Sequence, residues 1–343
     1  MKHLFTESGK LRKSLLYVTV VVSAIVLVTS CKPTDPPKPV LKISTLATGL
    51  AAPSGLEVDR KGMVWVAQGG TGKNDGKVSV ITPDGKKYDA IINFESVAFE
   101  GEADGPSHLL FADGLLYILG TKGKMYKANV SGYKPGDAPQ LASSLGVEDI
   151  GAFVLAYNFP NETNDSHPYN LTVGPNGDIY IADAGANAII RRSKTGVLSV
   201  LTEVPGIANP TPVGRRVIES VPTGIIYDGE HFLVTTLLGF PFPAGQAVVY
   251  KITPTGTVTV YQKGFTSLTD IAKGGSLGRL VVEHGTFGPM GFAPKTGRLV
   301  WANGTTPAVL ADGLNLPVGL KQANAHTWYV TSLGDGSVLK VTY

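Results

Sequence analysis

The stretch Pro168-Tyr169-Asn170-Leu171-Thr172-Val173, followed after Gly177 by Ile179-Tyr180-Ile181-Ala182-Asp183, decides the fold of this 343-residue chain. A short apolar run, a turn, and a second run of β-branched and aromatic residues predict a β-hairpin. Related hairpins begin at five other places: Pro53, Pro106, Pro222, Leu268 and Pro317. Self-similarity at a period of roughly 50 residues is typical of a β-propeller or another repeat array.

Most copies continue into two further strands. Val248–Ile252, the turn Pro254-Thr255-Gly256 and the run Thr257–Tyr261 show this clearly. Four antiparallel strands in each of six units predict an all-β, six-bladed propeller over residues 42–343. The final copy supplies only three strands, whereas a lone strand, Lys42–Ala47, precedes the first copy. We expect that strand to pair with the C-terminal blade, because the pairing closes the ring and removes two open edges.

The N-terminus has the layout of a bacterial lipoprotein signal peptide over residues 1–30. Basic residues precede an apolar stretch at positions 15–28, which is shorter than the about 20 residues that a transmembrane helix needs. Small residues then lead into Cys31, the only cysteine. This resembles a lipobox, which implies a diacylated Cys31 that anchors the protein to a membrane. The alternative is an ordinary signal peptide followed by an incidental cysteine.

A Pro-rich segment, residues 31–41, would form a stiff, extended tether between the anchor and the propeller. By analogy with lipoprotein sorting, Lys32 favours the outer membrane, so we expect a location in the bacterial cell envelope, on the periplasmic or the surface face. The whole chain carries 30 basic and 27 acidic residues, of which 4 and 1 lie in residues 1–30, leaving 26 of each. This balance gives no support to nucleic-acid binding.

Several longer motifs resemble the ScyD/ScyE family, a branch of the propellers that resemble NHL-repeat proteins. The motifs are Ile181–Ile189, Val221–Gly224, Leu238–Ala247 and Gly264–Ala272, together with the opening run Leu46–Pro53. The resemblance implies the propeller fold and fits a helical insert at Val147–Tyr157. The family is named after proteins encoded with scytonemin pigment biosynthesis, which implies, by name alone, an accessory role in secondary-metabolite assembly.

Two rings of residues are candidates for a binding site at the mouth of the central channel. The third positions of the six units are Gly55, His108, Asn170, Gly224, Asp270 and Gly319, and the second strands end at Gln68, Leu119, Asp183, Thr236, Glu283 and Ser332. We expect these rings to face the side of the propeller where the loops into the inner strands open. His167 and His284 lie beside them in sequence.

The polar members of these rings suit either a polar ligand or a divalent cation. Asp183, Asp270 and Glu283 could supply oxygen ligands, for which Ca²⁺ is the best match. Structural roles are the alternative: Asp183 could cap its own turn, Asp270 its preceding turn, and His108 could bond a carbonyl of a neighbouring blade. Phe240 and Phe242 lie in a Pro- and Gly-rich loop. Their side chains would either pack between neighbouring blades or, if exposed, anchor a hydrophobic ligand or protein.

These patterns favour non-catalytic binding of a small molecule, glycan or partner protein at the channel mouth. The alternative is a metal-dependent hydrolase or lactonase resembling gluconolactonase. One departure argues against this alternative. Among the metal ligands of gluconolactonase-type propellers are Asn or Asp residues directly before the third position of the repeat, where this chain has Ser54, Ser107, Tyr169, Thr223, Thr269 and Val318. The nearest acidic match to its other motif is Asp104-Gly105-Pro106.

Overall fold

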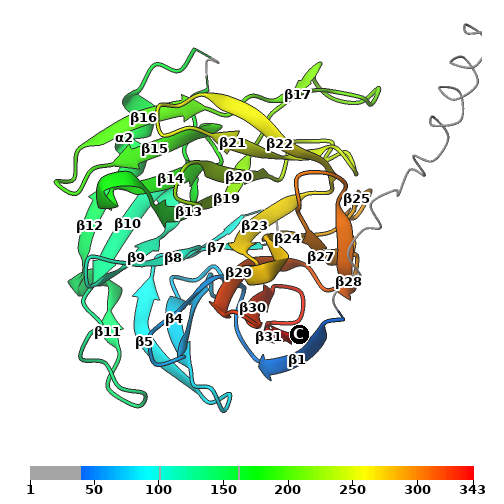
Figure 1. Ribbon diagram of the computed structural model, residues 1–343. Coiled ribbons are helices and arrows are strands. Elements are labelled where there is room, and N and C mark those ends of the chain that lie inside the picture. The colour runs from blue at the N-terminus through cyan, green and yellow to red at the C-terminus, as the bar shows by residue number, and fades with distance from the viewer. Residues whose placement is uncertain (1–39, 100–101, 161–162) are drawn as a thin grey trace, which may run out of the picture. The chain divides into compact units, whose positions relative to one another are not determined.

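The computed structural model describes residues 40–99, 102–160 and 163–343. Residues 40–343 form six four-stranded blades around a central channel, as the sequence predicts (Figure 1). The first blade contains β2 (Pro53–Val58), β3 (Val64–Gln68), β4 (Gly76–Ile81) and β5 (Lys87–Phe94), and the short β11 (Gln140–Leu141) extends it by parallel pairing with β5. The second contains β8 (Leu109–Ala112), β9 (Leu115–Leu119), β10 (Lys124–Ala128) and β12 (Gly146–Asp149).

The remaining blades follow the same antiparallel order from the channel outward. The third contains β13 (Pro168–Val173), β14 (Ile179–Asp183), β15 (Ala188–Arg192) and β16 (Leu198–Glu203). The fourth contains β19 (Pro222–Tyr227), β20 (Phe232–Thr236), β21 (Ala247–Ile252) and β22 (Val258–Phe265). The fifth contains β23 (Leu268–Lys273), β24 (Arg279–Glu283), β27 (Gly297–Trp301) and β28 (Ala308–Leu314).

The ring closes through the N-terminal strand, which confirms the prediction for Lys42–Ala47. β1 (Lys42–Ala47) pairs with β31 (Ser337–Thr342), and β30 (Thr327–Ser332) and β29 (Pro317–Asn324) complete the sixth blade. In the register, Lys42 lies opposite Thr342 and Thr45 opposite Leu339. In Figure 1 the first strand therefore lies beside the last, at the outer edge of the final blade.

The loops carry a few further elements. They are the hairpins β6 (Val97–Phe99) with β7 (Glu102–Asp104), β17 (Ile207–Ala208) with β18 (Val217–Ile218) and β25 (Phe287–Gly288) with β26 (Gly291–Phe292), and the 3₁₀ turns Thr121–Gly123, Ala142–Ser144, Pro175–Gly177 and Gly275–Leu277. Helix α2 spans Ile150–Ala156, with Asp149 as its N-cap. The helix expected at Val147–Tyr157 thus begins later, because Gly146–Asp149 pairs with β10 as a blade strand.

The core lies between consecutive blades, because each sheet buries both faces against its neighbours. Trp65 and Val80 of the first blade pack with Leu116 and Ile118 of the second, for example. The last interface joins Tyr329 and the C-terminal strand to the first blade. Burying one such large side chain contributes about 1.5–3 kcal/mol. No helix in the described ranges is long and apolar enough to cross a membrane.

Candidate functional site

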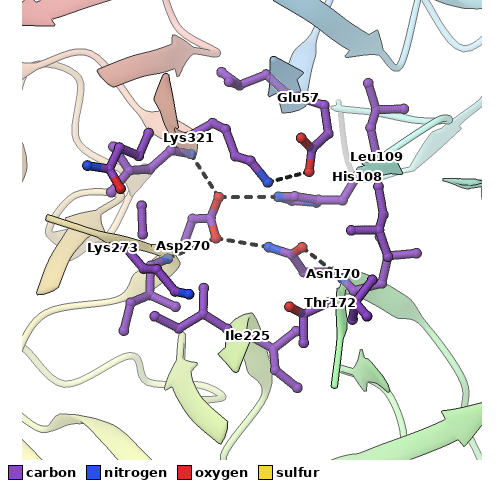
Figure 2. A pocket seen from close by; sticks show the side chains of 18 of the residues that line it. Glu57, His108, Leu109, Asn170, Thr172, Ile225, Asp270, Lys273 and Lys321 are labelled. Carbon is purple, nitrogen blue, oxygen red and sulfur yellow. Dashed lines mark hydrogen bonds and ion pairs between the residues drawn. The ribbon is translucent and has the colours of Figure 1, made fainter. Parts of the chain in front are cut away.

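A cavity of about 340 Å³ lies in the central channel, lined by residues from all six inner strands. The inner strands β2, β8, β13, β19, β23 and β29 each form the channel edge of their sheet, and each contacts its two neighbours around the axis. The lining begins at Asn170 and Asp270, near the starts of these strands, and reaches Lys273 and Lys321 farther along them (Figure 2). All six blades therefore shape one cavity.

Glycines at the third positions let the inner strands approach one another at the narrow end. A Cβ on Gly55 would lie 2.6 Å from the Cα of His108, and one on Gly224 would lie 2.6 Å from the Cα of Asp270. Both distances are shorter than atoms in contact can reach, so any larger residue would push two blades apart. His108 and Asp270 are thus set beside glycines because the ring leaves no room for side chains at every position.

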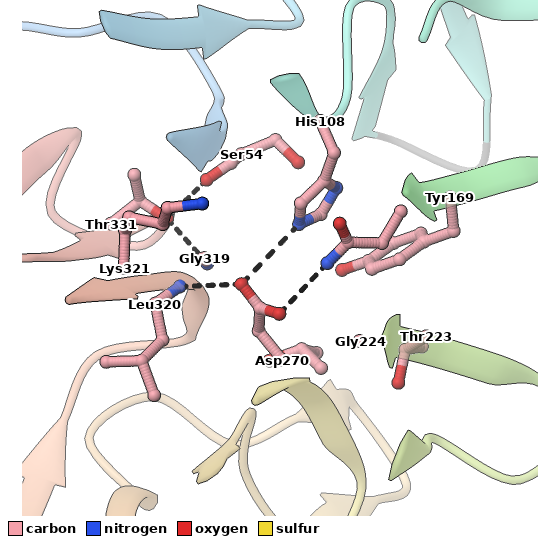
Figure 3. Close-up of polar contacts among 12 residues, drawn as sticks. Ser54, His108, Tyr169, Thr223, Gly224, Asp270, Gly319, Leu320, Lys321 and Thr331 are labelled. Carbon is pink, nitrogen blue, oxygen red and sulfur yellow. Dashed lines mark hydrogen bonds and ion pairs between the residues drawn. The ribbon is translucent and has the colours of Figure 1, made fainter. Parts of the chain in front are cut away.

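The polar side chains at the third positions meet across the channel, as the sequence grouped them. Asn170 donates from Nδ2 to Oδ1 of Asp270 at 2.9 Å, although the two residues lie in different blades. Asp270 also accepts the backbone N–H of Ile271 and, at Oδ2, that of Leu320, both at 2.8 Å. Nε2 of His108 lies 3.9 Å from Oδ2 of Asp270 (Figure 3). We call His108, Asn170 and Asp270 the channel cluster.

Burial determines the protonation of the channel cluster. The exposed fraction is 2% for His108 and 6% for both Asn170 and Asp270. Burial lowers the pKa of His108 to about 3, helped by the positive charge of Lys321 and partly offset by the Tyr169 backbone. Burial raises the pKa of Asp270 to about 7, against the opposing effects of its hydrogen-bond donors and Lys321. At neutral pH, His108 is therefore neutral and no ion pair joins it to Asp270.

His108 has unused hydrogen-bonding capacity. Neither Nδ1 nor Nε2 has a hydrogen-bond partner at good geometry among the described residues, although both atoms are buried. The backbone of Tyr169 in the neighbouring blade acts on the ring as a hydrogen-bond acceptor, as the structural alternative for His108 expects, and so raises its pKa against the larger effect of burial. The ring packs against Tyr169 at a centroid distance of 4.7 Å, which holds its orientation. A buried ring nitrogen without a partner costs about 1–3 kcal/mol of stability, so a group that bonded it would be bound favourably.

The walls and outer part of the cavity have a different character from its floor. Aliphatic residues form much of the wall, although most of their side chains pack in the cores between blades: Leu56, Leu109, Leu110, Leu171, Ile225, Ile226, Ile271 and Leu320. Farther out, Lys321 forms an ion pair with the buried Glu57, and Lys273 is exposed (Figure 2). The cavity therefore combines a polar floor, apolar walls and a charged rim.

The second predicted ring does not line this cavity, and most of its polar members hold loops in place. Oδ1 of Asp183 accepts the backbone N–H groups of His167 and Ala186, and Oδ2 accepts the hydroxyl of Ser166. Glu283 accepts the Thr266 N–H and pairs with Arg298. These two carboxylates fasten the loops that lead into the inner strands. Burial raises the pKa of each, partly offset by those donors.

Gln68 and Ser332 act in the same way in their own blades. Gln68 accepts the N–H of Ala51, and Ser332 donates to the carbonyl of Asn315. Because the pattern recurs at equivalent positions, the structural alternative considered for Asp183 accounts for its contacts. The sequence could not separate the two roles, since a carboxylate at a strand end suits both.

Asp183, Asp270 and Glu283 do not come together as the metal site considered from the sequence. Within residues 40–99, 102–160 and 163–343, no three His, Cys, Asp or Glu side chains are grouped so that they could hold a metal ion. Asp270 lies in the channel cluster, whereas the other two carboxylates fasten separate loops. The physical reason is that the oxygens of these carboxylates are already occupied. Backbone N–H groups donate to Asp183 and Glu283, and Arg298 pairs with Glu283, so protein donors neutralise the charge that a cation would otherwise neutralise.

The remaining predicted residues also lie outside the cavity lining. His167 is exposed, and Nδ1 of His284 contacts the Pro317 carbonyl at 3.1 Å. Phe242 packs against Phe287 and Phe292, whereas Phe240 is 57% exposed. The cavity extends from the channel cluster toward the ends of the inner strands, away from the loops where the sequence analysis placed the mouth. Cys31 lies outside the described residues.

The sequence analysis missed the outer cavity residues. Glu57, Lys273 and Lys321 follow the third position by two or three residues in their strands, so their side chains belong to the same inner strands as the channel cluster. The sequence did contain one feature that could have identified these cavity residues. They are polar residues in the second half of an inner strand, where apolar residues predominate. Glu57 and Lys321 satisfy that description in the first and last blades.

Comparison with known proteins identifies the fold and no family. No family model and no curated protein sequence matches the chain. Among solved structures, a catalytically inactive virginiamycin B lyase from Staphylococcus aureus with quinupristin has a TM-score of 0.54 at 16% identity, covering 88% of this chain and 99% of that one. The PQQ-bound aldose sugar dehydrogenase from Streptomyces coelicolor has a TM-score of 0.59 at 14% identity, covering 89% and 99%.

A putative gluconolactonase is similar at a TM-score of 0.51 and 14% identity, covering 88% of this chain and 92% of that one. This chain is a six-bladed β-propeller. The neighbours include propeller enzymes of several kinds, a lyase, a sugar dehydrogenase and a putative lactonase. TM-scores above 0.5 at 14–16% sequence identity establish a shared fold alone, and one propeller fold serves many activities.

Proposed function

We propose that this protein is an exported, lipid-anchored propeller that binds a small molecule in its central cavity and releases it unchanged. One observation carries the proposal: the channel cluster places the buried ring of His108, which has hydrogen-bonding capacity to spare, at the floor of a cavity of about 340 Å³. Ligand sites are typically concave, mostly apolar and supplied with a few placed polar groups, in the range of about 300–1,000 Å³.

The arrangement of Asp270 favours binding over chemistry. Its carboxyl group accepts three hydrogen bonds, from Asn170, Ile271 and Leu320, so its position and its acceptor directions are fixed. A group held in this way serves well as an orienting acceptor. The resemblance to the ScyD/ScyE family implies, by name alone, an accessory role in secondary-metabolite assembly.

A second candidate function is hydrolysis in the same cavity, and the protonation of Asp270 favours it. A carboxyl group with a pKa of about 7 can give and take a proton at physiological pH. The metal-dependent form of this reaction does not fit the described residues, because they hold no group of three metal-binding side chains. A hydrolase of this type would use Asp270 itself as its acid or base.

Native mass spectrometry distinguishes the two candidates. The mature protein, which begins at Cys31, would be incubated with small molecules below 1 kDa extracted from its source cells, and the bound masses recorded. Binding predicts an adduct whose released mass equals that of a compound in the extract, whereas hydrolysis predicts released products whose combined mass exceeds that of the compound by one water. Thr172 lines the cavity, so Thr172→Trp should block the adduct. Thr259→Trp, on the exposed outer strand β22, is the matched control.

A further inference from the structure

The chemistry of the channel cluster also limits what kind of molecule the cavity accepts. We propose that the cavity selects an uncharged, hydroxyl-rich molecule, such as a sugar or cyclitol, with one hydroxyl group bridging His108 and Asp270. This inference rests on the proposed function, because it names the ligand class of the same cavity. Three features of the structure carry it: the gap in the channel cluster, the edge strands and the charge balance.

The gap between the two side chains suits a hydroxyl group. Nε2 of His108 and Oδ2 of Asp270 are 3.9 Å apart, which is too far for a direct hydrogen bond. If an oxygen lies about 2.8 Å from each atom, the angle Nε2···O···Oδ2 is about 90°. This is near the angle between the donor and acceptor directions of a hydroxyl group. Such a hydroxyl would donate to Asp270 and accept from the Nε2–H of His108, and so satisfy a buried nitrogen.

The backbone of the channel wall offers further partners for hydroxyl groups. All six inner strands are edge strands, because each pairs on one side only within its sheet. The channel-facing edge of such a strand presents backbone N–H and C=O groups without partners in the ladder. A molecule with several hydroxyl groups can bond these edges around its circumference. The apolar part of the lining, supplied by aliphatic residues, suits the C–H faces of a sugar or cyclitol ring.

The charges around the cavity balance, which favours a ligand without charge. Two acidic groups and two basic groups line it: Glu57, Asp270, Lys273 and Lys321. Lys321 pairs with Glu57, and its charge also acts on both His108 and Asp270. A cation at the floor would face Lys321, and an anion would face Asp270. Either would also lose its hydration in a site whose buried charged groups are already engaged, Asp270 by three N–H donors and Glu57 by Lys321.

Three matched sugars test this selection by charge. D-glucose, 6-amino-6-deoxy-D-glucose and D-glucuronate share a ring and most hydroxyl groups but are neutral, cationic and anionic at pH 7.5, and myo-inositol adds a second neutral scaffold. Binding to the mature protein would be measured by saturation-transfer NMR at pH 7.5. We expect a neutral probe to bind more tightly than either charged one, and Asp270→Asn and His108→Gln to weaken it about tenfold, as loss of one good hydrogen bond does.

Surface substitutions of the same residue types are the controls. Asp84→Asn and His231→Gln change residues outside the cavity lining, and should leave binding unchanged. The inference is overturned if a charged probe binds as tightly as glucose, or if no neutral probe binds, or if the cavity variants bind like the controls. The Thr172→Trp adduct experiment tests the proposed function separately. If the wild type forms the adduct, Thr172→Trp loses it, and neutral sugars nevertheless show no preference, only the ligand class is rejected.

Discussion

Nε2 of His108 lies 3.9 Å from Oδ2 of Asp270 at the centre of the propeller, where both side chains are almost fully buried. Burial favours the neutral form of each group. It lowers the pKa of the imidazole to about 3 and raises that of the carboxyl to about 7. The two residues therefore affect stability in opposite directions as the pH changes, and each can be measured in the absence of the other.

Replacing Asp270 should make the protein more sensitive to acid. Between about pH 3 and 6.5 the unfolded chain protonates His108 and the native chain does not, so stability falls as the pH falls. Asp270 opposes this trend, because the native carboxyl holds its proton from about pH 3.8 to 7 whereas the unfolded one does not. Urea unfolding of Asp270→Asn from pH 7 to 4 should show a steeper loss than the wild type, with Asp84→Asn as the control.

Replacing His108 should have the reverse effect. His108→Gln leaves Asp270 as the principal buried titrating group of the channel cluster, so the free energy of unfolding should rise as the pH falls from 7 to 4. Each pKa unit corresponds to about 1.4 kcal/mol, so the difference in slope between the two variants is well within measurement. Parallel pH profiles for the two variants would contradict the opposed protonation of the channel cluster.

The carboxylate of Asp183 should matter for folding and not for ligand binding. Asp183→Ala removes the acceptor for two backbone N–H groups and one hydroxyl, in a position with no exposed area. Leaving buried donors unsatisfied costs about 1–3 kcal/mol each, so we expect a loss of at least about 2 kcal/mol in thermal or urea unfolding. At a temperature where the variant is folded, its ligand affinity should equal that of the wild type; a loss confined to affinity would return Asp183 to the binding site.

The sequence predicted the fold because repeats and hairpin patterns are local signals. The strand Lys42–Ala47, its pairing with the last blade and the third positions His108, Asn170 and Asp270 were all accessible from the spacing of the six units. The roles of Asp183 and Glu283 were not, because they depend on which loop N–H groups point at them. The direction of the cavity also depends on three-dimensional packing, since a strand sequence does not show which end of the channel remains open.

An interblade contact outside the channel should contribute to stability. Glu148 on β12 accepts hydrogen bonds from Arg192 of the third blade and pairs with Lys127 of its own blade. The hydrogen bond from Arg192 and the pairing with Lys127 lower the pKa of Glu148 to about 2. Glu148→Ala would leave the nearly buried Arg192 unpaired, at a cost of about 3 kcal/mol. Urea unfolding checks this, and Glu219→Ala, in an exposed pair with Arg215, should cost under about 1 kcal/mol.

Membrane attachment should depend on Cys31 alone if the proposed lipid anchor is correct. Cys31→Ser removes the thiol that would carry the diacylglycerol, so the protein should move from the membrane fraction to the soluble fraction. Immunoblots of fractionated cells would show the change, and a mass increase on the wild-type N-terminal peptide would identify the lipid. Ser30→Ala, which keeps a small residue before the cysteine, serves as the control. Continued sedimentation of Cys31→Ser with membranes would refute the anchor.

Closure of the ring by β1 should be necessary for the stability of the whole domain. β1 covers the outer edge of β31 through five aligned pairs, and Ile43 packs against the cluster that includes Trp328. Deleting residues 1–48 removes this strand, whereas deleting residues 1–39 keeps it. Removal exposes a strand edge and several apolar side chains. We therefore expect the shorter deletion to unfold like the mature protein in a circular-dichroism melt, and the longer one to melt at a clearly lower temperature or to aggregate. Equal melting temperatures would mean that the blades hold together without closure.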